Sequence, residues 1–251
     1  MKVLGVLLCI FLLSAVCIAE ETEYFDWKGS KLYSAKNYTE ALTYFEKALS
    51  QDPGYVDAWI HKGDTQKALK DYNGSLASYS SALQLDGNRA AAWSGITEDY
   101  TALKDYANAT ISAAKATEID NSKANWLREG NLLQLRGMYK EANEKYDGAI
   151  ALDPNYTSAL YKKAITLMLL NKINEATPLL DQVIGIDPAY KQAYLAKGVA
   201  LEASGKNTEA QQAYDKALEI DPAYAQALSG KMHALLALDK TEEAMKIFVN
   251  I

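Results

Sequence analysis

The sequence predicts an all-α fold, a solenoid of about seven helix-turn-helix repeats. The first observation behind this prediction is an Asp-Pro pair that recurs at residues 52–53, 153–154, 187–188 and 221–222. The last three pairs lie 34 residues apart, and the first lies 101 residues before the second, which is two repeats of 34 and one of 33. The second observation is that small and large apolar residues recur at fixed places within this period.

Placing the proline at position 32 of each repeat sets the repeat boundaries. The repeats are then 22–55, 56–89, 90–122, 123–156, 157–190, 191–224 and 225–251. Because the residue before a proline avoids the helical region, each Asp-Pro is expected to end the second helix of its repeat. Gly87 and Asn121 replace this proline, and the third repeat is one residue short. The joint over residues 119–124 is therefore expected to be the loosest.

Within each repeat, positions 4, 8 and 11 share one face of a first helix, and positions 20, 24 and 27 share one face of a second. Position 8 is mostly small: Gly29, Gly63, Thr97, Gly130, Ala164, Gly198, Met232. Position 24 is mostly large: Phe45, Tyr79, Ala113, Tyr146, Leu180, Tyr214, Phe248. We expect the small residues to let the two helices approach and the large residues, including the aromatic ones at position 4, to fill the core. One helix pair cannot bury its own apolar face, so the pairs must stack.

These columns, seven times in register, resemble the tetratricopeptide repeat (TPR) family over residues 22–251. The resemblance implies a right-handed α-solenoid whose first helices line a concave groove with positions 2, 5, 9 and 12. It also implies a protein-interaction scaffold that binds a segment of another protein.

The N-terminus has the layout of a secretory signal peptide over residues 1–19. Lys2 precedes an apolar run from Val3 to Ala19, which ends in small residues and is followed by two glutamates. The alternatives are an uncleaved anchor formed by residues 3–19, which is at the short limit for crossing a bilayer, and a lipid anchor on Cys17. We expect a secreted or cell-envelope protein, with membrane contact only through an uncleaved N-terminus. Both cysteines lie in this segment, so a mature chain would have no disulfide.

The composition argues against several classes of function. The net charge of −6 disfavours nucleic-acid binding, which needs clustered lysine and arginine. Two cysteines and two histidines are too few for a structural zinc site. His61 and His233 are five repeats apart, and no nucleophile, phosphate loop or metal-ligand motif accompanies them. No catalytic activity, metal or cofactor is expected.

The lining of the predicted groove changes along the chain. Its first half is acidic and its second half is apolar, so a partner segment would place a basic end near Asp26, Asp57 and Asp64 and an apolar anchor near Met168. The alternative is that these side chains only face solvent or pack within the array. The candidate partner-binding residues are Asp26, Asp57, Asp64, Glu98, Leu127, Asn131, Tyr161, Ile165, Met168, Leu195 and Val199.

Two further features leave other roles open. Asn37, Asn73, Asn108 and Asn155 lie in Asn-X-Ser/Thr sequons and are candidate N-glycosylation sites if the host glycosylates exported proteins. The last helix, residues 241–251, lacks a polar capping helix. A second predicted function is therefore a self-associating envelope component, a homo-oligomer joined through Met245, Phe248 and Ile251.

Overall fold

The computed structural model describes residues 19–249, apart from the side chains of residues 248 and 249. The described residues form helices joined by short turns, with no strand among them, so the predicted all-α repeat fold is confirmed. The predicted signal segment lies outside the described residues except for its last position. The chain divides into two compact units, which end and begin at Asn121 and Ser122. This division falls within residues 119–124, the joint that the sequence predicts to be loosest.

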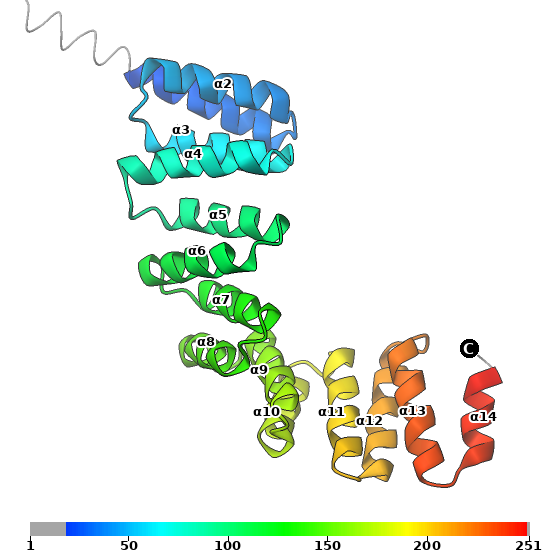
Figure 1. Ribbon diagram of the computed structural model, residues 1–251. Coiled ribbons are helices and arrows are strands. Elements are labelled where there is room, and N and C mark those ends of the chain that lie inside the picture. The colour runs from blue at the N-terminus through cyan, green and yellow to red at the C-terminus, as the bar shows by residue number, and fades with distance from the viewer. Residues whose placement is uncertain (1–18, 250–251) are drawn as a thin grey trace, which may run out of the picture. The chain divides into compact units, whose positions relative to one another are not determined.

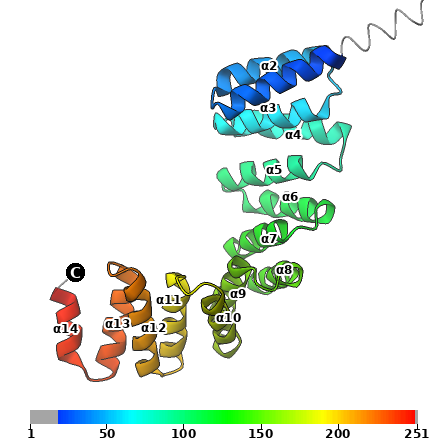
Figure 2. The ribbon, with the colours of Figure 1, turned by 180° about the vertical axis from the view of Figure 1, so that it is seen from behind.

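The first unit contains three helix pairs. Its helices are 19–34, α2 (Tyr38–Gln51), α3 (Val56–Ala68), α4 (Tyr72–Leu85), α5 (Ala90–Ala102) and α6 (Tyr106–Ile119). They lie side by side in chain order (Figures 1 and 2). Each helix therefore packs mainly against its neighbours in the sequence, as a stacked repeat requires.

The second unit contains four helix pairs. Its helices are α7 (Lys123–Leu135), α8 (Tyr139–Leu152), α9 (Thr157–Leu169), α10 (Ile173–Ile186), α11 (Lys191–Ala203), α12 (Asn207–Ile220), α13 (Ala225–Ala237) and α14 (Thr241–Val249). Each first helix from α3 to α13 begins at the residue where the sequence period places the start of a repeat.

The aspartate of each Asp-Pro pair ends a helix and closes the following turn. Helix α2 ends at Gln51, and the carboxylate of Asp52 then accepts a hydrogen bond from the backbone N–H of Gly54 at 2.8 Å. Asp86 does the same for Asn88 at 3.0 Å although glycine follows it instead of proline. The aspartate thus holds this turn even where the proline is missing.

The turn inside each repeat has a left-handed residue at position 15. Only Gly137 and Gly205 are glycines, with φ of 74° and 72°. The other five repeats place side chains there, at Lys36, Lys70, Lys104, Asn171 and Asp239. In the first repeat, the backbone N–H of the next residue returns to the carbonyl of Leu32 at 2.9 Å. This backbone hydrogen bond is typical of a helix C-terminus.

We expect Gly205→Ala to lower the free energy of unfolding by about 1 kcal/mol, because left-handed backbone disfavours any residue with a Cβ atom. No atom lies within 4 Å of the position that this Cβ would take, so the cost would come from the backbone alone. Lys70→Gly is expected to have the opposite effect. Urea denaturation of both variants tests this, and an equal change of the same sign in both would contradict it.

The core lies between the two helices of each repeat and between successive repeats. Every residue at position 20, from Ala41 to Ala244, is buried. At position 24, Phe45, Tyr79, Tyr146 and Tyr214 are almost completely buried. The expectation that the aromatic residues of position 4 also belong to the core is wrong in part.

The position 4 aromatics Phe25, Trp59, Trp93, Trp126 and Tyr194 are only half-buried. The physical reason is visible at two of them, where the indole N–H needs an acceptor at the repeat edge. Trp59 donates to the carbonyl of Pro53 at 2.9 Å, and Trp93 donates to that of Gly87 at 3.1 Å.

Candidate functional site

The acidic residues predicted to bind a partner lie on the first helices of the first unit, and each has a partner within the chain. Asp26, on the helix 19–34, is buried and its carboxylate lies 2.8 Å from Nδ1 of His61 on α3. This hydrogen bond raises the pKa of His61, against the opposing effect of burial. The pair joins the first repeat to the second.

The other three carboxylates are also engaged. Asp64 accepts a hydrogen bond from the Tyr79 hydroxyl at 2.6 Å and lies 3.4 Å from Nζ of Lys67. Lys67 also donates to Glu98 at 2.7 Å. Asp57 is paired with Arg89. Four carboxylates therefore share two permanent cations, and the surface remains acidic.

Two tyrosines beside these carboxylates report the same negative potential. Burial raises the pKa of Tyr33, and the charge of Asp64 raises it further. Burial also raises the pKa of Tyr55, with the charges of Asp26 and Asp57 adding to it. In both cases the carboxylates disfavour another negative charge.

A hollow of about 260 Å³ lies beside these groups in the first unit. It is lined by Ser30, Tyr33, Ser34, Phe45, His61 and Asp64. The lining combines aromatic rings, hydroxyl groups and one carboxylate, a set that suits a cationic side chain with an apolar stem.

His61 and Phe45 are part of this surface, although neither was among the partner-binding residues predicted from the sequence. His61 is at position 6 and Phe45 is at position 24, both outside the positions expected to line the groove. A signal was present for the histidine. His61 follows Asp26 by 35 residues, one repeat and one residue, which puts an acid and a base at neighbouring places in successive repeats.

The apolar candidates of the second unit lie on α7, α9 and α11. Tyr161 packs against Tyr190 with ring centroids 5.2 Å apart, and burial raises the pKa of Tyr161 to about 12. Ile165 and Met168 are half-buried against the core between α9 and α10. Val199 is exposed over 44% of its surface.

The remaining candidates of this unit also contact the core. Leu127 packs against the cluster around Tyr146, whose hydroxyl donates to the side-chain oxygen of Asn131 at 3.1 Å. Leu195 packs against the cluster around Tyr214. The structure thus brings these residues onto the first helices but uses most of them in packing.

The glycosylation and self-association candidates are at the surface where they are described. Asn37, Asn73, Asn108 and Asn155 are all exposed. Met245 on α14 is 57% exposed. Ile251 and the side chain of Phe248 lie outside the described residues. Both roles stay predictions.

Residues 19–249 contain neither a candidate metal site nor a candidate membrane-spanning helix. No group of three or more His, Cys, Asp or Glu side chains in this part of the chain is arranged to hold a metal ion. Among the described helices, none combines the length and the apolar character needed to cross a membrane.

Comparisons with known proteins agree on one architecture. YrrB, a TPR protein with an unusual peptide-binding site, superimposes with a TM-score of 0.67 at 24% identity, covering 74% of this chain and 97% of its own. A TPR protein from Parabacteroides merdae ATCC 43184 gives a TM-score of 0.68 at 17% identity and covers 92% of both chains. PilW, a type IV pilus biogenesis factor, gives 0.65 at 17% identity, covering 83% and 97%.

At these identities the similarity establishes the fold. A search of curated protein sequences found no match. The sequence pattern described as tetratricopeptide repeat matches residues 32–94, 133–200 and 201–251, which is more than half of the chain. Together with the repeat geometry, this match shows that the chain belongs to the tetratricopeptide repeat family.

Proposed function

We propose that the chain is an exported, non-catalytic scaffold that binds a basic segment of another protein at the hollow of its first unit. The family fold favours a scaffold, because its structural relatives include a peptide-binding protein and a pilus biogenesis factor. The signal-like layout of residues 1–19 supports the proposal of export.

The observation that carries the proposal is the hollow beside a surface where four carboxylates share two permanent cations. Tyr33 and Phe45 offer aromatic faces to the stem of a lysine or arginine, while Asp64 offers a carboxylate to its charge. Peptides that bind such surfaces gain specificity from a few anchored side chains. The apolar residues of the second unit, centred on Met168, are proposed to contact a separate apolar part of the partner.

The test is binding of a lysine-bearing probe peptide, followed by fluorescence anisotropy at low salt. Ser30→Leu places a branched side chain in the hollow and is expected to weaken binding about tenfold, a difference of about 1.4 kcal/mol. Ser80→Leu, on the exposed side of α4, is the matched control and should bind as the unchanged chain does. Equal affinity for both variants would refute the proposed site.

Affinity should also depend on pH. Because the pKa of His61 is raised, its imidazole becomes positively charged at a higher pH than an ordinary histidine does as the pH falls. That charge opposes a basic ligand in the hollow, so we expect weaker binding at lower pH. His61→Gln should remove this dependence.

A further inference from the structure

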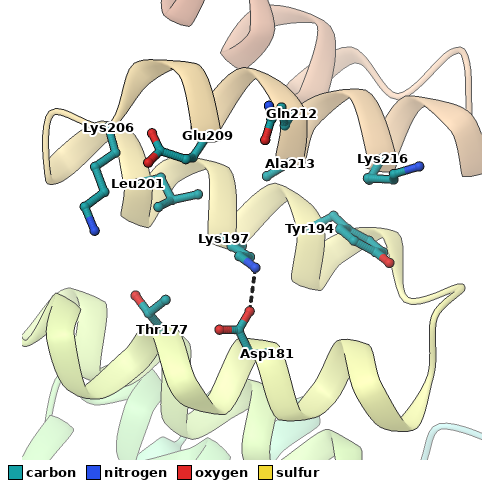
Figure 3. Close-up of a pocket in the computed structure, with 10 residues that line it drawn as sticks. All are labelled: Thr177, Asp181, Tyr194, Lys197, Leu201, Lys206, Glu209, Gln212, Ala213 and Lys216. Atoms are coloured by element: carbon teal, nitrogen blue, oxygen red, sulfur yellow. Dashed lines mark ion pairs between the residues drawn. The ribbon is translucent and has the colours of Figure 1, made fainter.

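A second hollow, of about 570 Å³, lies in the second unit between α10 and α12, with α11 as its floor (Figure 3). Leu201 of α11 and Ala213 of α12 contribute its apolar surface, and Lys206 and Lys216 line it from the α12 side. None of these residues belongs to the predicted partner-binding set. The hollow is therefore a surface of its own, independent of the proposed function above.

One short side chain contributes to the space. Ala213 is at position 23 of its repeat, where the fifth repeat has Leu179 and the seventh has Ile247. Leu179 packs against the core of its own repeat pair. An alanine at this place leaves unfilled the volume that a branched side chain occupies in the neighbouring repeats.

The charges around the hollow are unevenly compensated. Lys197 and Asp181 face each other across it at 2.6 Å, as the dashed line in Figure 3 shows, and neutralise each other. In the fifth repeat Lys172 pairs with Glu175 at 3.0 Å.

The equivalent Lys206 makes no ion pair within residues 19–249, although Glu209 lines the hollow at the place of Glu175. Figure 3 shows the Lys206 side chain extending from the start of α12 toward the α10 side of the hollow. Lys216 pairs only with Glu219, and both members of that pair are more than half exposed. Such exposed pairs contribute little, so both ammonium groups are available to a ligand.

We propose that this hollow binds an acidic segment of a partner protein. One apolar side chain of the segment contacts Leu201 and Ala213, and carboxylates on either side of it meet Lys206 and Lys216. Ten residues of helix separate the two lysines, which is about 15 Å. An extended segment covers that distance in about five residues. The chain as a whole carries a charge of −6, so the attraction is a property of this place and not of the whole surface.

The experiment uses the full chain in a mild detergent and a fluorescent probe peptide. The peptide has a central leucine flanked by two glutamates, which are about five residues from each other. Fluorescence anisotropy should show saturable binding. Lys206→Glu with Lys216→Glu is expected to weaken it about tenfold, because both charges then repel the probe. Ala213→Leu, which copies the fifth repeat, is expected to weaken it to a similar extent by filling the hollow.

Matched controls separate this site from general charge effects. Lys140→Glu, on the exposed first turn of α8, should leave the affinity within twofold of the unchanged chain. A probe with glutamines in place of the glutamates, and one with glycine in place of the leucine, should each bind at least fivefold more weakly. Circular dichroism melts establish that each variant folds.

Three results would overturn the proposal: no binding of the acidic probe, equal binding of the glycine probe, or unchanged binding by Ala213→Leu. Equal binding of the glycine probe would identify a site for any polyanion. None of these results bears on the hollow of the first unit, because its lining residues and its probe are different.

Discussion

Gly63→Ala is expected to lower the free energy of unfolding by about 2–3 kcal/mol, although alanine normally favours a helix over glycine. A Cβ atom at this position would lie 2.7 Å from Cε1 of Tyr79, closer than such contacts occur. The ring has little room to retreat, because Gly95 of the next repeat lies against its other side, where an added Cβ atom would be only 2.2 Å from Cζ of Tyr79. The Tyr79 hydroxyl is also held by Asp64 at 2.6 Å.

Gly185→Ala is the matched control. Gly185 is also in a helix, α10, but no atom lies within 4 Å of its built Cβ. Here the helix propensity acts alone, so the substitution should raise the free energy of unfolding by about 0.5–1 kcal/mol. Urea denaturation measures both, and opposite signs are the expected result.

A compensating substitution should restore part of the loss. The fifth repeat replaces this glycine–tyrosine pair by Ala164 and Leu180, which are both buried. Adding Tyr79→Leu to Gly63→Ala copies that combination in the second repeat. The double variant should be more stable than the sum of the two single effects predicts. Strict additivity would mean that the ring contact does not limit this position.

Asp99→Asn is expected to raise the free energy of unfolding by about 2 kcal/mol at pH 7. Asp99 is completely buried on α5, and neither of its carboxyl oxygens has a hydrogen-bond partner among the described residues. Burial raises the pKa of this carboxyl to about 6, against the opposing influence of Ser75 and Lys67. A rise of about two units means that keeping the ionised form buried costs about 3 kcal/mol above pH 6. Part of this gain is offset by the cost of burying the amide.

The sign of the pH dependence follows from the raised pKa. Folding favours the protonated carboxyl, so the folded state binds more protons than the unfolded state between about pH 4 and pH 6. The unchanged chain should gain stability from this group as the pH falls through that window. Asp99→Asn should lack the gain, while the contribution of His61 stays in both proteins and cancels in the comparison.

Thermal or urea denaturation at pH 7, 6 and 5 checks this. The difference in stability between Asp99→Asn and the unchanged chain should shrink as the pH falls. A constant difference across the range would contradict the prediction. So would a variant less stable than the unchanged chain at pH 7, because the ionised Asp99 carboxylate would then not destabilise the folded state.

The repeat starts and most core columns were predictable, because period and helical spacing depend only on the order of the residues. Position 10 shows where this reasoning stops. It is buried in the neighbouring repeats as Thr65 and Leu132, and the sequence offered no warning that Asp99 would be buried at the same place. Position 10 was not among the predicted core positions, so the burial of the Asp99 carboxyl was not predicted.

The candidate site was less predictable. The first-helix positions of Asp26, Asp57 and Asp64 followed from the period, but their partners did not. His61 and Tyr79 come from other helices and Arg89 from the turn before α5, and side-chain direction determines which of them reach the carboxylates. The hollow of the second unit depends on the small side chain of Ala213, where the neighbouring repeats have larger residues, and no sequence motif marks such a place.

One ion pair recurs where successive repeats meet. A lysine at position 7 contacts an acid at position 25 of the preceding repeat: Lys62–Glu46, Lys163–Asp147, Lys197–Asp181 and Lys231–Asp215. Two junctions differ in sequence: the second and third repeats have Ser80 and Ile96 at these places, and the third and fourth have Ala114 and Glu129. Near-identical repeats can dock in the wrong order while a chain folds. A lysine-bearing repeat set against Ser80 would lose its counter-charge, so the junctions that lack the pair differ from those that have it, and this difference helps each repeat to find its proper neighbour.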